Sequence, residues 1–169
     1  MNTILGIDPG FDRVGWAVGQ VVDKKLQVWD FGCIQTDKQQ IVSERYQAID
    51  DQLTAILTKY KPADLAIESL FFFKNAKSVM RVSEARGAII SCCLRHQLQL
   101  FEYTPLQIKQ AVTGNGRADK TAVAKMVKLQ LKLPEKIVGG KIETKIIDDA
   151  MDAIAILLTH ALMSRSPKL

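Results

Sequence analysis

The sequence predicts an α/β protein in which a mixed central sheet of about five strands is flanked by helices. Two observations support this prediction. Short runs rich in β-branched and aromatic residues come first along the chain, and segments with apolar residues at helical spacing then alternate with further short apolar runs. This order is typical of a sheet with helices packed on it.

The predicted strands are short apolar segments bounded by turn residues. Pro9-Gly10 ends the first strand, and Asp23-Lys24-Lys25 separates the second from the third, which suggests a hairpin. The expected strands are Ile4–Asp8, Val14–Val22, Leu26–Ile34, Leu65–Glu68 and Leu98–Tyr103.

The predicted helices follow the 3.6-residue period of their apolar side chains. Asp119 is a candidate N-cap, and Lys61-Pro62 and Leu133-Pro134 are stop signals. The expected helices span Val42–Tyr60, Ala76–His96, Pro105–Val112, Asp119–Leu131 and Asp148–Met163. The polar stretch Glu135–Lys145 is expected to be a loop. Three early strands, a helix, a strand and then alternating helices and strands form the order of an RNase H-like fold.

The length and the net charge limit the number of domains and the kinds of partner to expect. The 169 residues, 47% of them hydrophobic, are expected to form one domain over residues 1–163, followed by a short tail over 164–169. The 23 Lys and Arg against 18 Asp and Glu give a net charge of +5, which suits a polyanionic partner without requiring one.

Cysteine usage and hydropathy indicate the cellular compartment and the types of structural site to expect. Cys33, Cys92 and Cys93 form no CxxC pattern and have no histidine cluster nearby, so a disulfide framework or a zinc site is not expected. The first residues lack a basic leader, and no apolar run approaches the roughly 18 residues of a membrane span. We therefore expect a cytoplasmic protein without membrane association.

Two carboxylates stand at predicted strand ends. Asp8 comes where the first strand gives way to Pro9-Gly10, and Glu68 ends the apolar Leu65-Ala66-Ile67 run. Each has an ordinary alternative, since Asp8 can simply cap a turn and Glu68 can be an exposed strand-end side chain. If the two strands are parallel neighbours, however, both acids emerge at one edge of the sheet, where they repel each other and require a cation.

A third group of acids begins the last predicted helix. Asp149 and Asp152 share one helical face, and Asp148 shares that face with Asp152. Acids in a first helical turn also offset the helix dipole, so a purely structural role is the alternative. The apolar residues that follow place this acidic face beside the core.

The chemistry of such acids favours hard divalent cations. Magnesium prefers carboxylate and water oxygens, and four acids from several elements can hold two ions that together hydrolyse a phosphodiester. Neither His96 nor His160 sits in a recognisable triad, so each is expected to be structural or exposed.

An ordered series of motifs runs along the chain from residue 3 to residue 163. Its segments are Gly6-Ile7-Asp8-Pro9-Gly10, Ala66-Ile67-Glu68 with Phe71 and Lys74-Asn75, Ala85-Arg86-Gly87, Phe101-Glu102-Tyr103, Gln107-Ile108-Lys109-Gln110, Gly114-Asn115-Gly116, Lys120, Leu131-Lys132-Leu133-Pro134, Asp149-Ala150-Met151-Asp152-Ala153 and Thr159-His160. In content and order this series resembles the RuvC family of crossover (Holliday) junction endodeoxyribonucleases.

The resemblance implies a homodimeric endonuclease that makes paired nicks in strands of like polarity at four-way DNA junctions during recombination and repair, with one active site per subunit. It implies that Asp8, Glu68, Asp149 and Asp152 are the catalytic, metal-binding carboxylates, with two Mg²⁺ ions per site or Mn²⁺ in their place. It also implies a branch-migration helicase complex as a partner.

Several residues are candidates for DNA contacts. Phe71 directly follows the proposed site and could contact bases at the junction centre, although a core position is the alternative. Lys109 and Lys120 match family positions that handle the scissile phosphate. Lys74, Lys77 and Arg81 could contact the backbone, or could be ordinary surface charges.

Two other functions remain open on the sequence. Asp12-Arg13-Val14-Gly15 also resembles the opening of bacterial rRNA-processing relatives, so a nuclease for structured RNA is one alternative. A junction-binding module without activity is the other. The complete set of four acids argues against that module. The segment from Glu135 to Ile147 is longer than the family pattern, and the tail is shorter.

Overall fold

The computed structural model describes residues 2–69, 76–138, 141–143 and 146–164, without the side chains of 76–78, 136–138 and 141–143. In chain order the elements are β1 (Thr3–Asp8), β2 (Arg13–Val22), β3 (Lys25–Gln35), α1 (Val42–Tyr60), β4 (Asp64–Glu68), α2 (Ala76–Arg95), β5 (Gln99–Tyr103), α3 (Pro105–Thr113), α4 (Lys120–Gln130), β6 (Lys136–Val138), β7 (Lys141–Glu143) and α5 (Asp148–Met163).

The central sheet is mixed and has five strands, as predicted, and their order is β3-β2-β1-β4-β5. The pairs β1–β2 and β2–β3 are antiparallel, whereas β1–β4 and β4–β5 are parallel. Asp23 and Lys24 both have positive φ, at 49° and 61°, which is the backbone that a tight two-residue hairpin requires. The predicted hairpin between β2 and β3 is therefore confirmed.

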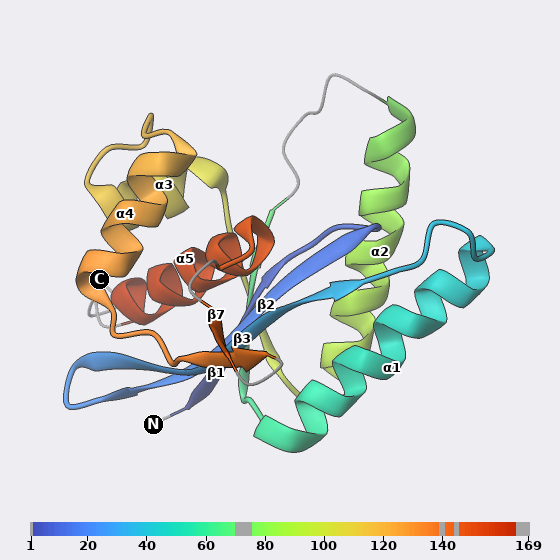
Figure 1. The fold of residues 1–169 in the computed structure, drawn as a ribbon, viewed down its shortest axis with the longest axis horizontal. Helices are drawn as coiled ribbons and strands as arrows, with labels where there is room; N and C mark the ends of the chain where they lie inside the picture. Colours follow the sequence, from blue (N-terminus) through green and yellow to red (C-terminus); the bar gives the residue numbers. More distant parts are fainter. Residues whose placement is uncertain (1, 70–75, 139–140, 144–145, 165–169) are drawn as a thin grey trace.

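Helices cover both faces of this sheet (Figure 1). Leu5, Ile7, Leu65 and Ile67 belong to the apolar cluster that also contains buried residues of α1 and α2. Ile4 and Ala66 belong to the opposite cluster, with α3, α4 and α5. Because side chains alternate across a strand, a sheet buried on both faces explains why these strands read as continuous apolar runs.

Helix α5 crosses the middle of the sheet and is buried over most of its length. It lies unusually close to β1, since a Cβ atom at Gly6 would stand 2.6 Å from the main-chain oxygen of Ala153. At that separation no side chain fits between the two backbones. Glycine at residue 6 therefore allows α5 to bring its acidic first turn to the edge of the sheet where β1 ends.

The segment predicted as a loop between Glu135 and Lys145 differs from that prediction. It contains two short antiparallel strands, β6 and β7, which pair Ile137 with Ile142 and Val138 with Lys141. Apolar residues on either side of Gly139-Gly140 are a hairpin signal that the polar composition of the segment concealed.

No helix within the described residues is long and apolar enough to cross a membrane.

Candidate metal centre

Asp8 and Glu68 meet because of the register of two parallel strands. Ile7 of β1 pairs with Ile67 of β4, so the next residue of each strand carries a carboxylate at the same edge of the sheet. The carboxyl ends of parallel strands are where ligands usually bind in α/β folds. The juxtaposition expected from the sequence is therefore present.

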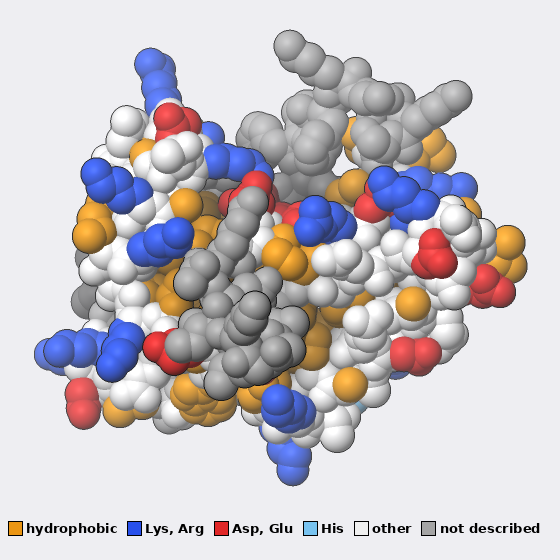
Figure 2. All heavy atoms as spheres, viewed as in Figure 1, with side chains coloured by type: hydrophobic (Ala, Val, Ile, Leu, Met, Phe, Trp, Pro, Cys, Tyr) orange, Lys and Arg blue, Asp and Glu red, His pale blue; other side chains and the backbone are white. Residues whose placement is uncertain are grey.

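A hollow of about 480 Å³ opens at this edge. Asp8, Glu68 and Asp152 contribute its acidic side chains, and Lys109 and Lys120 contribute its basic ones. Figure 2 shows acidic side chains gathered near the centre of the upper part of this face, with Lys and Arg side chains on both sides. The hollow therefore offers oxygen ligands for a cation and positive charges for a phosphate.

The acids of the hollow disfavour one another's ionisation. Burial, followed by the charges of Asp152, Glu68 and Asp149, raises the pKa of Asp8 to about 8, against a smaller lowering by Lys120. Burial is also the largest cause of the raised pKa of Glu68, followed by the charge of Asp152. Buried carboxylates that repel each other are the arrangement that a divalent cation stabilises.

Helix α4 supplies the lysine nearest to the acids. Asp119 caps α4 by accepting a hydrogen bond from the main-chain N–H of Ala122, which fixes Lys120 as the first helical residue. The Nζ atom of Lys120 lies 2.8 Å from the Oδ2 atom of Asp152. This bond is the largest cause of the raised pKa of Lys120, so the lysine remains a cation at the mouth of the hollow.

Arg86 holds the strand end that carries Glu68. Its Nε atom donates a hydrogen bond of 3.1 Å to the main-chain oxygen of Glu68, and its guanidinium forms an ion pair with Glu102 of β5. The N–H of Ser69 donates to the main-chain oxygen of Tyr103 over 2.9 Å. These contacts give a physical role to two of the family segments, the one around Arg86 and the one around Glu102.

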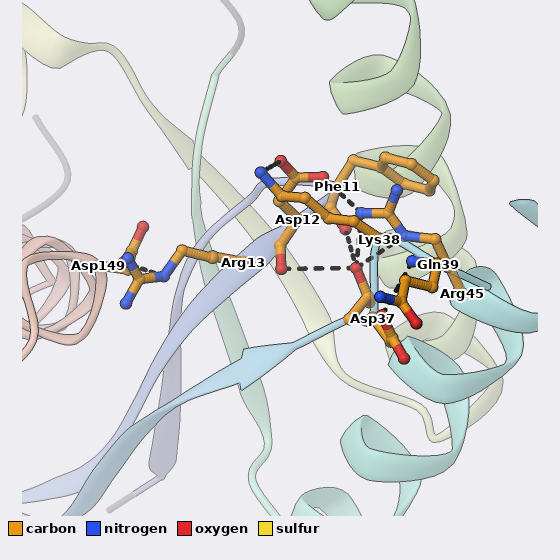
Figure 3. Close-up of polar contacts among 9 residues, drawn as sticks. Phe11, Asp12, Arg13, Asp37, Lys38, Gln39, Arg45 and Asp149 are labelled. Carbon is orange, nitrogen blue, oxygen red and sulfur yellow. Dashed lines mark hydrogen bonds and ion pairs between the residues drawn. The ribbon is translucent and has the colours of Figure 1, made fainter.

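Asp149 lies apart from the three acids of the hollow. Its Oδ2 atom pairs at 3.1 Å with the Nε atom of Arg13, as Figure 3 shows, and it lines a second hollow with Arg13 and Arg81. Asp148 is exposed and lies in a groove between α4 and α5. In the part of the chain that the structure describes, no three Asp, Glu, His or Cys side chains stand close enough together to enclose an ion.

The sequence did not reveal the importance of Arg13 or of Arg45. Arg45 is a buried residue of α1 that pairs with Asp12, donates to the hydroxyl of Thr36 and stacks over the ring of Phe11 (Figure 3). It thus fixes the segment that follows Asp8. Nothing in the local sequence pattern distinguishes Arg45 from an exposed residue of an amphipathic helix.

The predicted DNA-contacting residues divide into three groups. Phe71 and Lys74 lie outside the described residues, and the side chain of Lys77 is also undescribed. Arg81 is exposed and pairs with Glu84 over 2.8 Å. Lys109 and Lys120 lie in the hollow beside the acids.

The fold and this acidic edge define a class of protein, the RNase H-like nucleases. The family described as "Crossover junction endodeoxyribonuclease RuvC" matches residues 4–160. The chain belongs to this RuvC family of Holliday junction resolvases, whose members are nucleases that depend on divalent metal ions.

Individual relatives agree over nearly the whole chain. The chain is 42% identical to the crossover junction endodeoxyribonuclease RuvC of Petrotoga mobilis, over 98% of this chain and 96% of the relative. It is 41% identical to that of Finegoldia magna, over 96% and 94%. The structure of Thermus thermophilus RuvC in complex with a Holliday junction substrate superposes with a TM-score of 0.85 at 30% identity, covering 98% of this chain and 96% of that one.

Proposed function

We propose that this chain cuts four-way DNA junctions by paired nicks in strands of like polarity, as a homodimer with one active site per subunit. The observation that carries the proposal is the hollow that joins Asp8, Glu68 and Asp152 to Lys109 and Lys120. Membership of a family of junction endodeoxyribonucleases favours DNA over structured RNA as the substrate.

Asp8, Glu68, Asp149 and Asp152 are the proposed ligands of two Mg²⁺ ions, for which Mn²⁺ could substitute. All four offer hard oxygen donors, and the raised pKa of Asp8 indicates that these charges are poorly compensated by the protein alone. When bound, such ions generate a nucleophilic water and stabilise the leaving oxygen of a phosphodiester. Because the described side chains do not already enclose an ion, the carboxylates must move towards each other to bind one.

The two lysines of the hollow act on the DNA. Lys109 and Lys120 stand on different helices at its rim, so they can hold the scissile phosphate between them and offset the charge that develops during cleavage. Lys120 also holds Asp152 in place. Phe71, Lys74, Lys77 and Arg81 are the further proposed contacts to the junction.

The domain organisation, the cellular location and the partner of the protein are further proposals. We propose that residues 1–163 form a single nuclease domain, that 164–169 are a tail, and that the protein acts in the cytoplasm beside a branch-migration helicase complex. The described part of the tail is Ser164 alone, since 165–169 lie outside the described residues.

Cleavage of matched substrates tests the proposed activity. Purified protein is incubated with a labelled four-way junction, the corresponding linear duplex and a structured RNA, with and without Mg²⁺. The proposal predicts symmetrical nicks in the junction alone, only with metal. Asp8→Asn should bind the junction without cutting it, whereas Asp51→Asn, an exposed change on α1, should cut normally. Binding without cutting by the wild type would favour the non-catalytic module, and cutting of the RNA alone would favour the RNA nuclease.

A further inference from the structure

Two acids of α5, one helical turn apart, have different partners. Asp152 lines the hollow and pairs with Lys120 over 2.8 Å, whereas Asp149 pairs with Arg13 over 3.1 Å and lines the neighbouring hollow. Asp149 is also the weakest of the three acids whose charge raises the pKa of Asp8. Asp152 and Asp149 are therefore both paired with basic side chains, and Asp149 is the one whose partner, Arg13, lines the neighbouring hollow.

Arg13 is built into a fixed position for this contact. It is the first residue of β2 and pairs with Gln35 of β3 in the sheet, and its guanidinium forms an ion pair with Asp149 on α5. The side chain of Arg13 is 47% exposed and that of Asp149 is 26% exposed, so the pair lies at the surface, where ion pairs are weak. A contact of this strength can be broken by a stronger ligand of the carboxylate.

We propose that Arg13 is a positioning residue that competes with the divalent ions for Asp149. It draws the carboxylate of Asp149 away from the hollow in the metal-free protein, and it releases the carboxylate when an ion binds. This inference rests on the proposed metal centre. The sign of the effect follows from the contact itself, because Arg13 occupies an oxygen of Asp149 that the ion would otherwise bind.

The inference predicts that loss of Arg13 tightens metal binding. In Arg13→Gln the carboxylate of Asp149 is free to turn towards the hollow, so the Kd for Mn²⁺ should fall on the order of two- to fivefold, the range expected for a surface ion pair. Arg13→Lys keeps the charge and should restore most of the wild-type affinity. If Arg13 instead held Asp149 in position for the ion, Arg13→Gln would raise the Kd for Mn²⁺.

The experiment measures Mn²⁺ binding to the full-length protein without DNA, by calorimetry and by the rise in Tm with added MnCl₂. Lys38→Gln is the matched control, because Lys38 is an exposed cation that pairs with Asp12 instead of Asp149. Asp149→Asn and the double variant Arg13→Gln/Asp149→Asn complete a cycle. Circular dichroism and the metal-free Tm establish that each variant is folded.

The expected result is tighter binding in Arg13→Gln, no change in Lys38→Gln, and no effect of Arg13→Gln once Asp149 is replaced. Unchanged or weaker binding in Arg13→Gln would overturn the inference. So would an equal gain in Lys38→Gln, or a gain that persists with Asp149→Asn, since either would indicate a general charge effect. If the wild type binds no Mn²⁺, the proposed metal centre fails and the inference fails with it. If the wild type binds and Arg13→Gln binds equally well, only the inference fails.

Discussion

The main-chain oxygen of Asp149 lies so close to Gly15 that a Cβ atom at residue 15 would stand 1.9 Å from it. The first turn of α5 thus rests directly on β2, with no side chain between them. This contact sets the height of the acidic turn above the end of β1, where Asp8 emerges. Gly15 therefore contributes to the geometry of the site although it has no side chain.

Substitution of Gly15 should therefore damage the site and the fold together. In Gly15→Ala the added methyl group must push α5 away from β2, which we expect to lower the free energy of unfolding by about 1–3 kcal/mol and to weaken Mn²⁺ binding. Chemical denaturation and calorimetry measure the two effects.

Gly87→Ala is the control for the Gly15 prediction. Nothing lies within 4 Å of a Cβ atom at Gly87, which is exposed on α2, so this change should be neutral or stabilise the helix by up to about 1 kcal/mol. Equal stability of Gly15→Ala and the wild type would show that the contact between α5 and β2 yields freely.

The pKa of Asp8 predicts an unusual dependence of stability on pH. Burial and neighbouring acids raise this pKa from 3.8 to about 8, so between these pH values the folded protein binds a proton that the unfolded chain does not. The contribution of Asp8 to stability is therefore present at low pH and lost as the pH rises to 8. At pH 8 without divalent ions, Asp8→Asn should be more stable than the wild type, by on the order of 2–4 kcal/mol.

Denaturation of both proteins from pH 5 to pH 9, with and without Mg²⁺, measures this effect. The difference between them reports on Asp8 and on the acids coupled to its charge, because groups elsewhere in the protein titrate equally in both. The difference should grow with pH in the absence of metal and shrink when Mg²⁺ stabilises the wild type alone. A difference that does not vary with pH would contradict the assigned environment of Asp8.

Lys120 should matter for cleavage more than for junction binding. Its ammonium lies at the mouth of the hollow, bonded to Asp152, so Lys120→Gln removes a charge from the place where the phosphate reacts. We expect a loss of about 10²-fold in the single-turnover cleavage rate, the usual cost of one such donor. Lys125→Gln, an exposed change on the same helix, should reduce the rate far less. Equal losses of cleavage rate in both variants would indicate that Lys120 is only a general DNA contact.

His160 predicts a second pH effect, far along α5 from the acids. Its Nδ1 atom lies 2.7 Å from the hydroxyl of Tyr103, and burial, against the charge of Asp64, lowers the pKa of the imidazole below 6.5. The unfolded chain takes up a proton below pH 6.5 more readily than the folded protein does, so this contribution to stability is lost as the pH falls from about 7 towards 5.

Replacement of His160 isolates its contribution to the pH dependence of the free energy of unfolding. His160→Gln should cost about 1–3 kcal/mol at pH 7 by disturbing buried hydrogen bonds, and its stability should fall less steeply on acidification. His96→Gln, an exposed change, should retain the wild-type profile. An unchanged slope in His160→Gln would argue against a neutral, buried imidazole.

The sequence allowed Asp8 and Glu68 to be placed correctly because strand ends can be read from apolar runs and turn residues. Their meeting then needed only two parallel neighbouring strands, which the structure contains. The spacing of Asp149 and Asp152 also put both on one face of a helix. It could not show that one acid turns to Lys120 and the other to Arg13, because that depends on how α5 rests on β2.

Other features depended on long-range contacts that no local pattern reports. Arg45 is buried against Thr36 and Phe11, and no local pattern in the sequence indicates this burial. The strands β6 and β7 were hidden by Lys136, Lys141 and Glu143, which give the segment its polar composition.

The central claim is that the carboxylates at the ends of β1 and β4 and on α5 form one metal centre. Anomalous diffraction from crystals grown with Mn²⁺ tests it most directly, since it locates the ion independently of any activity. We expect anomalous peaks bounded by Asp8, Glu68, Asp149 and Asp152, with Asp149 turned away from Arg13. Mn²⁺ bound elsewhere, or no peak at this edge at saturating metal, would contradict it.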